Sequence, residues 1–245
     1  MNRRYLRFGL RTLLVVVTIA ALVGGWLAER MHRRQAAVRT IEAAGGGLLS
    51  ERSWRRIQTI FLSPTAPQVE VRRTWRELLF GDQQRGIDFT DGRPLAGQTL
   101  DAVAAISEVK DLSFHGGVLT DDHVTRLAAL RQVETFIASG SPLTDRTAEV
   151  VAEWPELNWL ELNDTQLTDD AAGHLIKLQK LEVLRIQGTS ITDRGFAQLS
   201  ALKNLKDLTI GDSPNRPMPV SVQCRDELQR ALPNCRFNGT FYARH

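Results

Sequence analysis

The sequence predicts an α/β solenoid in which each repeat is a short helix followed by a short parallel strand, preceded by an N-terminal transmembrane helix. Three observations predict it: apolar residues recur every 24 residues from Leu95 onward, a long uncharged run lies near the N-terminus, and the charge changes sign along the chain. Residues 1–80 hold 14 Lys and Arg against 5 Asp and Glu, a net +9, whereas residues 81–245 hold 17 against 23, a net −6. This asymmetry indicates that the two parts face different surroundings.

The composition bounds the class of protein. At 42% apolar and 24% charged, the 245-residue chain is an ordinary globular protein, which excludes a disordered or collagen-like chain. Two cysteines are too few for a disulfide framework or a four-cysteine zinc site. We divide the chain into four parts: residues 1–30, a basic flank and membrane helix; 31–86, a connector and N-terminal cap; 87–238, the repeats and C-terminal cap; and 239–245, a tail.

The uncharged run at residues 12–28 predicts a single-pass membrane anchor. As a helix it is roughly 26 Å long, near the lower limit for crossing a bilayer. Trp26 lies where an interfacial anchor is expected, and arginines that can snorkel to the headgroups flank the run on both sides: Arg3, Arg4, Arg7, Arg11, Arg30, Arg33, Arg34 and Arg39. A cleaved signal peptide, which would yield a secreted protein, and a buried helix are the alternatives. No small-x-small cleavage site follows the run, since bulky Trp26 comes directly after Gly24 and Gly25.

The orientation follows from charge. Four arginines lie on each side of the run, so the arginine count alone gives no orientation under the positive-inside rule. The positive charge of the terminal amine and the position of Arg11 at the boundary favour an N-terminus on the inner side of the membrane. We therefore expect the repeats on the outer, extracytoplasmic side of the membrane. Attraction to anionic lipid accompanies such a flank. A nucleic-acid partner is not expected, because the basic residues flank a bilayer segment and the remainder is acidic.

The connector is predicted to begin with a helix and to end with a second, shorter helix. Residues 29–44 predict a helix with an apolar stripe at Ala37, Val38, Ile41 and Ala44, ended by Gly45–Gly47. Residues 48–70 are ambiguous: Ile57 to Leu62 favour a strand or docked edge, and Pro64 and Pro67 a loop. Residues 71–81 again show helical periodicity, and the alternation of Ile87 and Phe89 predicts a strand.

Five blocks of 24 residues start at Leu95, Leu119, Leu143, Leu167 and Ile191. In each block the same seven positions are apolar, 35 of 35 in all. Positions six, nine and twelve recur every three residues, as in the buried stripe of a helix, and a later pair two residues apart predicts the buried face of a strand. Such a unit cannot bury its apolar face alone, so neighbours must stack, with strands on the concave side and helices on the convex side.

The segment Leu157-x-x-Leu160-x-Leu162-x-x-Thr165-x-Leu167 resembles the leucine-rich-repeat consensus. Many members carry Asn where this chain has a small hydroxyl residue, which we expect to turn inward and satisfy backbone groups: Ser141, Thr165, Thr189 and Ser213. The Leu-Thr-Asp opening of the repeats resembles a bacterial type. The string RFGLRTLLVVVTIAALVGGWL resembles the anchors that precede such repeats in planctomycete proteins. The resemblance implies a right-handed leucine-rich-repeat solenoid over residues 87–237 and a membrane anchor over residues 1–30.

A Thr-Asp pair precedes four of the predicted helices. The pairs are Thr120 and Asp121, Thr144 and Asp145, Thr168 and Asp169, and Thr192 and Asp193. We interpret them as structural helix caps, which also suit the helix dipole. Stacked carboxylates that bind a metal are the alternative.

The C-terminal end of the array is predicted from a break in the period. Pro214, Pro217 and Pro219 interrupt it, and Leu228, Ala231 and Leu232 indicate a last short helix. Residues 233–237 then supply a last strand or cap, and Leu-Pro-Asn-Cys at 232–235 resembles the ends of related repeat proteins. We expect Cys235 to be a buried thiol; a disulfide with Cys224 is the alternative.

Catalytic signatures are absent from the sequence. None of the five histidines has metal-site spacing with another ligand, and neither nucleophile elbows nor dinucleotide fingerprints occur. Gly211-Asp212-Ser213 resembles the opening motif of an esterase family, but Ser213 belongs to the hydroxyl column and His245 lacks the preceding Asp of that family. We expect no enzyme, no cofactor, no metal and no small-molecule substrate.

Binding by a solenoid usually uses its concave strand face. Three apolar residues are expected there in successive repeats with polar neighbours, an arrangement typical of a protein-binding hot spot. The predicted partner-binding residues are Ile137, Trp159, Glu161, Asn163, Val183 and Arg185. The alternatives are that Trp159 packs against residues 48–81, or that these side chains have no binding role. A structural envelope component without a discrete ligand is the other class of function.

Overall fold

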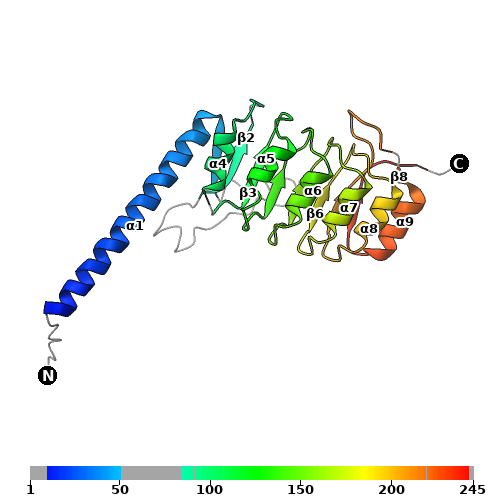
Figure 1. Cartoon of the computed structure of the whole chain (residues 1–245). Coiled ribbons are helices and arrows are strands. Elements are labelled where there is room, and N and C mark those ends of the chain that lie inside the picture. The colour runs from blue at the N-terminus through cyan, green and yellow to red at the C-terminus, as the bar shows by residue number, and fades with distance from the viewer. Residues whose placement is uncertain (1–9, 51–83, 91, 107, 219, 243–245) are drawn as a thin grey trace, which may run out of the picture.

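The computed structural model describes residues 10–50, 84–90, 92–106, 108–218 and 220–242; of these, the side chains of residues 10–14, 16, 49, 50, 84 and 85 are not described. A long N-terminal helix projects from an elongated array in which helices line one side and strands the other (Figure 1). The α/β repeat fold with parallel strands that the periodicity predicts is therefore confirmed.

Helix α1 (Leu10–Ala43) runs without interruption from the uncharged run into the connector, which confirms the helix expected at residues 29–44. It ends where Gly45 adopts a φ of +84°, a conformation that glycine tolerates best. Its last turns pack on the array: Ala37 and Ile41 are buried, and α1 contacts α4 (Gly97–Ala104).

The anchor expected at residues 12–28 is part of α1. Over the portion of the chain whose side chains are described, no helix is both long and apolar enough to cross a membrane. Residues 12–14 and 16 of the expected anchor lie outside that portion.

The first two strands close one end of the sheet. Strand β1 (Gly46–Ser50) pairs antiparallel with β2 (Gln84–Phe89), and Ile87 and Phe89 are buried as their alternation predicts. The sequence does not predict β1, because Gly45–Gly47 indicate only the end of a helix. The strand or edge expected at residues 57–62, the loop at 64–67 and the helix at 71–81 lie outside the described residues.

The repeats follow in the predicted order of helix and strand. The helices are α4, α5 (Asp121–Arg126), α6 (Asp145–Val151), α7 (Asp169–Leu175), α8 (Asp193–Leu199) and α9 (Val222–Ala231). The strands are β3 (Asp111–Phe114), β4 (Thr135–Ile137), β5 (Trp159–Glu161), β6 (Val183–Arg185), β7 (Asp207–Thr209) and β9 (Arg236–Asn238). From β2 onward they form one parallel sheet in the order β2-β3-β4-β5-β6-β7-β9.

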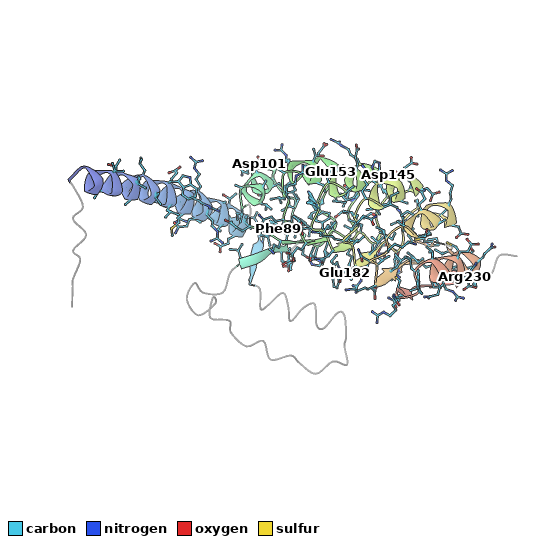
Figure 2. The ribbon with its side chains drawn as sticks, turned by 90° about the horizontal axis from the view of Figure 1, so that it is seen from below. Phe89, Asp101, Asp145, Glu153, Glu182 and Arg230 are labelled. Atoms are coloured by element: carbon cyan, nitrogen blue, oxygen red, sulfur yellow. The ribbon has the colours of Figure 1, made fainter. Side chains whose placement is uncertain are left out.

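The core lies between the helices and this sheet. All 35 apolar positions of the five blocks are buried, with Leu95 the most exposed at 7%. At the N-terminal end the core contains a row of rings: Phe89 and Phe114 stack at 5.1 Å, and Phe136 meets Trp154 edge to face at 5.3 Å. Phe89 lies where α1 meets the array (Figure 2).

The C-terminal end follows the prediction in outline. Helix α9 is longer than expected, and β9 adds the last parallel strand beside β7. Strands β8 (Val220–Ser221) and β10 (Phe241–Tyr242) form a second, two-stranded sheet that the sequence did not predict. Cys224 and Cys235 are buried thiols that form no disulfide with each other. Burial and the nearby charge of Asp207 raise the pKa of the Cys235 thiol to about 11, so it is protonated at neutral pH.

Candidate binding face on the strands

The threonine of each Thr-Asp pair lies at the N-cap of its helix. The side-chain oxygen of Thr120 accepts a hydrogen bond from His123 N, and those of the other three accept from the residue two positions on: Thr144, Thr168 and Thr192. Helix α4 begins after Ala96 without such a side-chain bond. The caps therefore occupy the four inner helices and are absent from this first one.

The aspartates make a different contact from the one expected. Each is the first residue of its helix, and the carboxylates of Asp121, Asp145 and Asp169 accept hydrogen bonds from the threonine of the following repeat, whereas that of Asp193 accepts from Ser221 N. Asp145 accepts from Thr168 N at 2.7 Å and from Thr168 Oγ1 at 2.6 Å. The same pair of bonds joins Asp121 to Thr144 and Asp169 to Thr192. We call these three pairs the Thr–Asp ladder; Asp145 lies at the helix-lined edge of the array (Figure 2).

The ladder engages three of the four carboxylates that are the alternative metal ligands: Asp121, Asp145 and Asp169. Partial burial opposes ionisation of Asp121, but hydrogen bonds from Thr144 and Thr147 outweigh it and hold the pKa of this carboxyl below its ordinary value. Within the described ranges, no group of three or more His, Cys, Asp or Glu side chains is placed to hold a metal ion. The ladder instead joins neighbouring repeats through charge-assisted hydrogen bonds.

Three members of the hydroxyl column are buried, Ser141, Thr165 and Thr189, and the two threonines bond the backbone at the end of a strand. Thr165 Oγ1 donates to Leu162 O at 2.8 Å, and Thr189 Oγ1 donates to Ile186 O at 3.0 Å. Ser213 differs, since its hydroxyl donates to the Asp164 carboxylate and accepts from Arg216 N at 3.0 Å. The hydroxyl of the esterase-like Gly-Asp-Ser string thus ties a loop to an earlier repeat, and His245 lies outside the described residues.

The strand face, the side of the sheet turned away from the helices, carries two rows of side chains. The first row is buried: Thr135, Trp159, Val183 and Asp207. The second row is half-buried: Ile137, Glu161, Arg185 and Thr209. Strand alternation predicted the face on which each side chain lies but not its exposure.

The prediction of an exposed apolar centre on this face is therefore wrong, because two of its three apolar side chains are buried. Trp159 is 4% exposed and Val183 is 5% exposed. The guanidinium of Arg185 lies over the Trp159 ring at 5.1 Å, which covers part of it. The alternative, that Trp159 packs against residues 48–81, falls mostly outside the described residues.

A connected polar cluster surrounds Glu161 in the middle of the face. Glu161 pairs with Arg185 at 3.2 Å, and its other oxygen accepts from Ser139 Oγ at 3.2 Å and from Asn163 Nδ2 at 3.3 Å. Asn163 Oδ1 in turn accepts from Gln187 N at 2.9 Å. We call these five residues the Glu161 network. Ser139 and Gln187 were not predicted as site residues, although strand alternation placed them on this face.

At the N-terminal end of the sheet, His115 approaches two side chains. Its Nε2 lies 2.8 Å from Ser113 Oγ and 3.5 Å from Asp88 Oδ1. The same ring nitrogen contacts both partners. A catalytic triad needs one nitrogen for the nucleophile and the other for the carboxylate, so this arrangement differs from a triad.

Comparison with known proteins identifies the fold. No protein-family model and no curated protein matches the chain. Among solved structures it is similar to an internalin (inlF) from Listeria monocytogenes, with a TM-score of 0.50 and 16% identity, over 64% of this chain and 48% of that one. It is also similar to internalin C2 (inlC2) of the same species, with a TM-score of 0.48 and 16% identity, over 65% and 74% of the two chains. The chain spans about half the length of the first of these. At this identity the likeness shows the fold alone, the repeating α/β solenoid with parallel strands described above.

Proposed function

We propose that this chain is a non-enzymatic, membrane-anchored leucine-rich-repeat module that binds a protein partner through its strand face. The Glu161 network is the observation that carries the proposal. It links hydrogen-bonding groups of three neighbouring repeats at the middle of an extended sheet. Extended faces of this kind are the surfaces that solenoids use for binding.

The chemistry of the network suits a protein partner. The Glu161 and Arg185 side chains are 18% and 19% exposed, so both are reachable while their neighbours already hold them in place. Preorganised side chains lose less conformational entropy when a partner binds. Arg and Trp are also enriched at the centres of interfaces. Here Trp159 is buried and packs beneath the Arg185 guanidinium, so it is not an exposed anchor residue.

The membrane anchor is the second part of the proposal. The run at residues 12–28 lies within α1, and its described large side chains are exposed: Val15, Val17, Ile19, Leu22, Val23, Trp26 and Leu27. Apolar surface of this extent is unfavourable in water, and a bilayer would cover it. The arginine balance and the terminal amine favour an inner N-terminus, with the repeats on the outer side of the membrane.

Site-specific photo-crosslinking in native membranes tests partner binding. A crosslinking amino acid in place of Ile137, which lies opposite Glu161 on the strand face but outside the network, should give one discrete protein adduct, whereas one in place of Glu156, in the loop before β5, should not. Arg185→Glu should abolish the adduct, because it removes the cation and repels Glu161. Lys180→Glu is the matched control, since Lys180 lies outside the network and pairs with Glu156 at 2.7 Å.

The outcomes separate the proposal from its alternatives. An adduct that persists in Arg185→Glu, with the fold intact by circular dichroism, contradicts binding through the network. No adduct from any position on the face favours an envelope component without a discrete ligand. Resistance to alkaline carbonate extraction supports the anchor, and a mature N-terminus beyond residue 28 would mean secretion after signal cleavage.

A further inference from the structure

A groove of about 450 Å³ lies between α1 and the segment that follows α4. Its wall on α1 is formed by Trp26, Glu29, Arg30, Arg33 and Arg34, and Glu108 faces them from the array. We propose that this groove binds the phosphate head group of one anionic phospholipid. The inference rests on the proposed insertion of α1 into a membrane.

The position of the groove along α1 matches the depth of a head group. The exposed apolar side chains of the predicted span precede it, with Leu22 69% exposed and Trp26 60% exposed. At 1.5 Å per residue, Arg30 lies about 6 Å beyond Trp26 along the helix axis. Trp prefers the boundary between lipid and water, and phosphates lie just outside it. Insertion of residues 12–28 would therefore bring the groove to the phosphate layer.

The chemistry of the groove suits a phosphate. Three arginines outnumber two carboxylates, which leaves a net charge of +1. Guanidinium groups bind phosphate oxygens through forked N–H donors. An acyl chain does not suit a wall with this many charges, because burying them against hydrocarbon is costly.

Existing contacts hold two of these arginines at the groove wall. Arg30 pairs with Glu108 at 2.5 Å and lies over the Trp26 ring at 5.6 Å. Arg33 pairs with Glu29 through Nε at 2.7 Å, which leaves its Nη donors outside that bond. Both side chains stay accessible, at 53% and 78% exposed.

Lipid retention by the full-length protein tests the inference. The protein is reconstituted in nanodiscs of phosphatidylcholine and phosphatidylglycerol, extracted into mild detergent, and analysed by native mass spectrometry. We expect one phosphatidylglycerol retained in preference to phosphatidylcholine. Arg33→Gln should lower this retention about fivefold, as expected for the loss of one cation at an anionic surface. Glu108→Gln should raise it, because it removes a negative charge from the groove.

Arg39→Gln is the matched control, since it removes the same charge from an exposed position on α1 outside the groove. Equal losses in Arg33→Gln and Arg39→Gln would mean general attraction to the membrane and overturn the site. Tight binding of inorganic phosphate to the lipid-free protein would assign the groove to a soluble anion instead. Flotation of the protein with pure phosphatidylcholine vesicles, combined with no lipid preference, would contradict the site and leave the anchor standing. No flotation with either kind of vesicle would contradict both.

Discussion

At the scale of single residues, the Thr–Asp ladder shows how two residue types serve two repeats at once. Each threonine caps its own helix and also donates to the aspartate of the preceding repeat. The carboxylate accepts two bonds from one neighbour, and Asp169 accepts a third from Gly195 N at 3.1 Å. Hydrogen bonds to a charged group contribute about 1.5–3 kcal/mol each, more than bonds between neutral groups.

Two adjacent acidic residues allow a test of the ladder. Asp169→Ala removes all three bonds to the next repeat. We expect the free energy of unfolding to fall by about 2–3 kcal/mol, less than three full bonds would contribute, because the Asp169 side chain is 19% exposed and water replaces part of the lost hydrogen bonding. Asp170→Ala removes an acidic group from the same first turn but none of these bonds. We therefore expect the free energy of unfolding to fall by no more than about 1 kcal/mol, the size of a helix-dipole effect. Chemical denaturation followed by circular dichroism measures both. Equal losses would mean that the aspartates act only on the dipole.

At the scale of elements, the repeat helices are too short to be stable in isolation. Helices α5 to α8 contain six or seven residues, whereas isolated helices need at least about 12–15. Each is held by its cap, by its neighbours and by its buried stripe. Contacts between adjacent helices therefore limit which side chains each position accepts.

Two helix glycines should respond oppositely to alanine. A Cβ at Gly195 would clash with the Asp169 carboxylate and lie 2.7 Å from Ile191 Cγ2, so Gly195→Ala should destabilise the protein by about 1–3 kcal/mol. A Cβ at Gly173 would lie no closer than 3.6 Å to Gln198. Gly173→Ala should therefore stabilise α7 by about 0.5–1 kcal/mol. Thermal unfolding measures the change in midpoint for each variant. A change in the same direction for both variants would contradict the close approach of α7 and α8.

At the scale of the whole molecule, both ends of the array are covered by elements that lie outside the five 24-residue blocks. The last turns of α1 and strand β1 cover the N-terminal end, and α9 and β9 cover the C-terminal end (Figure 1). Open ends of a solenoid would expose its core to water. Helix α1 therefore has two roles along its length, because its first half is the proposed anchor and its last turns are a cap.

Two substitutions in α1 separate these roles. Ile41 is fully buried, so Ile41→Ala should lower the free energy of unfolding of the array by about 2–5 kcal/mol. Leu22→Ala changes a side chain that is 69% exposed and should leave that free energy unchanged. Denaturation of the full-length protein in mild detergent measures both. Unchanged stability in Ile41→Ala would contradict the capping role.

The periodic part of the fold could be predicted closely from the sequence. The side-chain exposure and the hydrogen-bond network of the strand face could not. The seven apolar columns predicted a core that the structure contains in full, since burial in a stacked repeat recurs with the sequence period. For Trp159 and Val183 the predicted face was correct and the predicted exposure wrong. Alternation along a strand determines direction only, and exposure depends on atoms remote in sequence, such as the Arg185 guanidinium over Trp159.

The repeat length, the order of helix and strand, and the buried columns could all be predicted from the sequence, because each of these follows from local periodicity and turn residues. Three features became visible only in the folded chain: each ladder aspartate bonds the next repeat, β1 pairs with β2, and the strand face presents the Glu161 network instead of an exposed apolar centre. These contacts depend on how neighbouring repeats are offset from one another. That offset is set by packing across the whole array and is not encoded in the spacing of any one repeat.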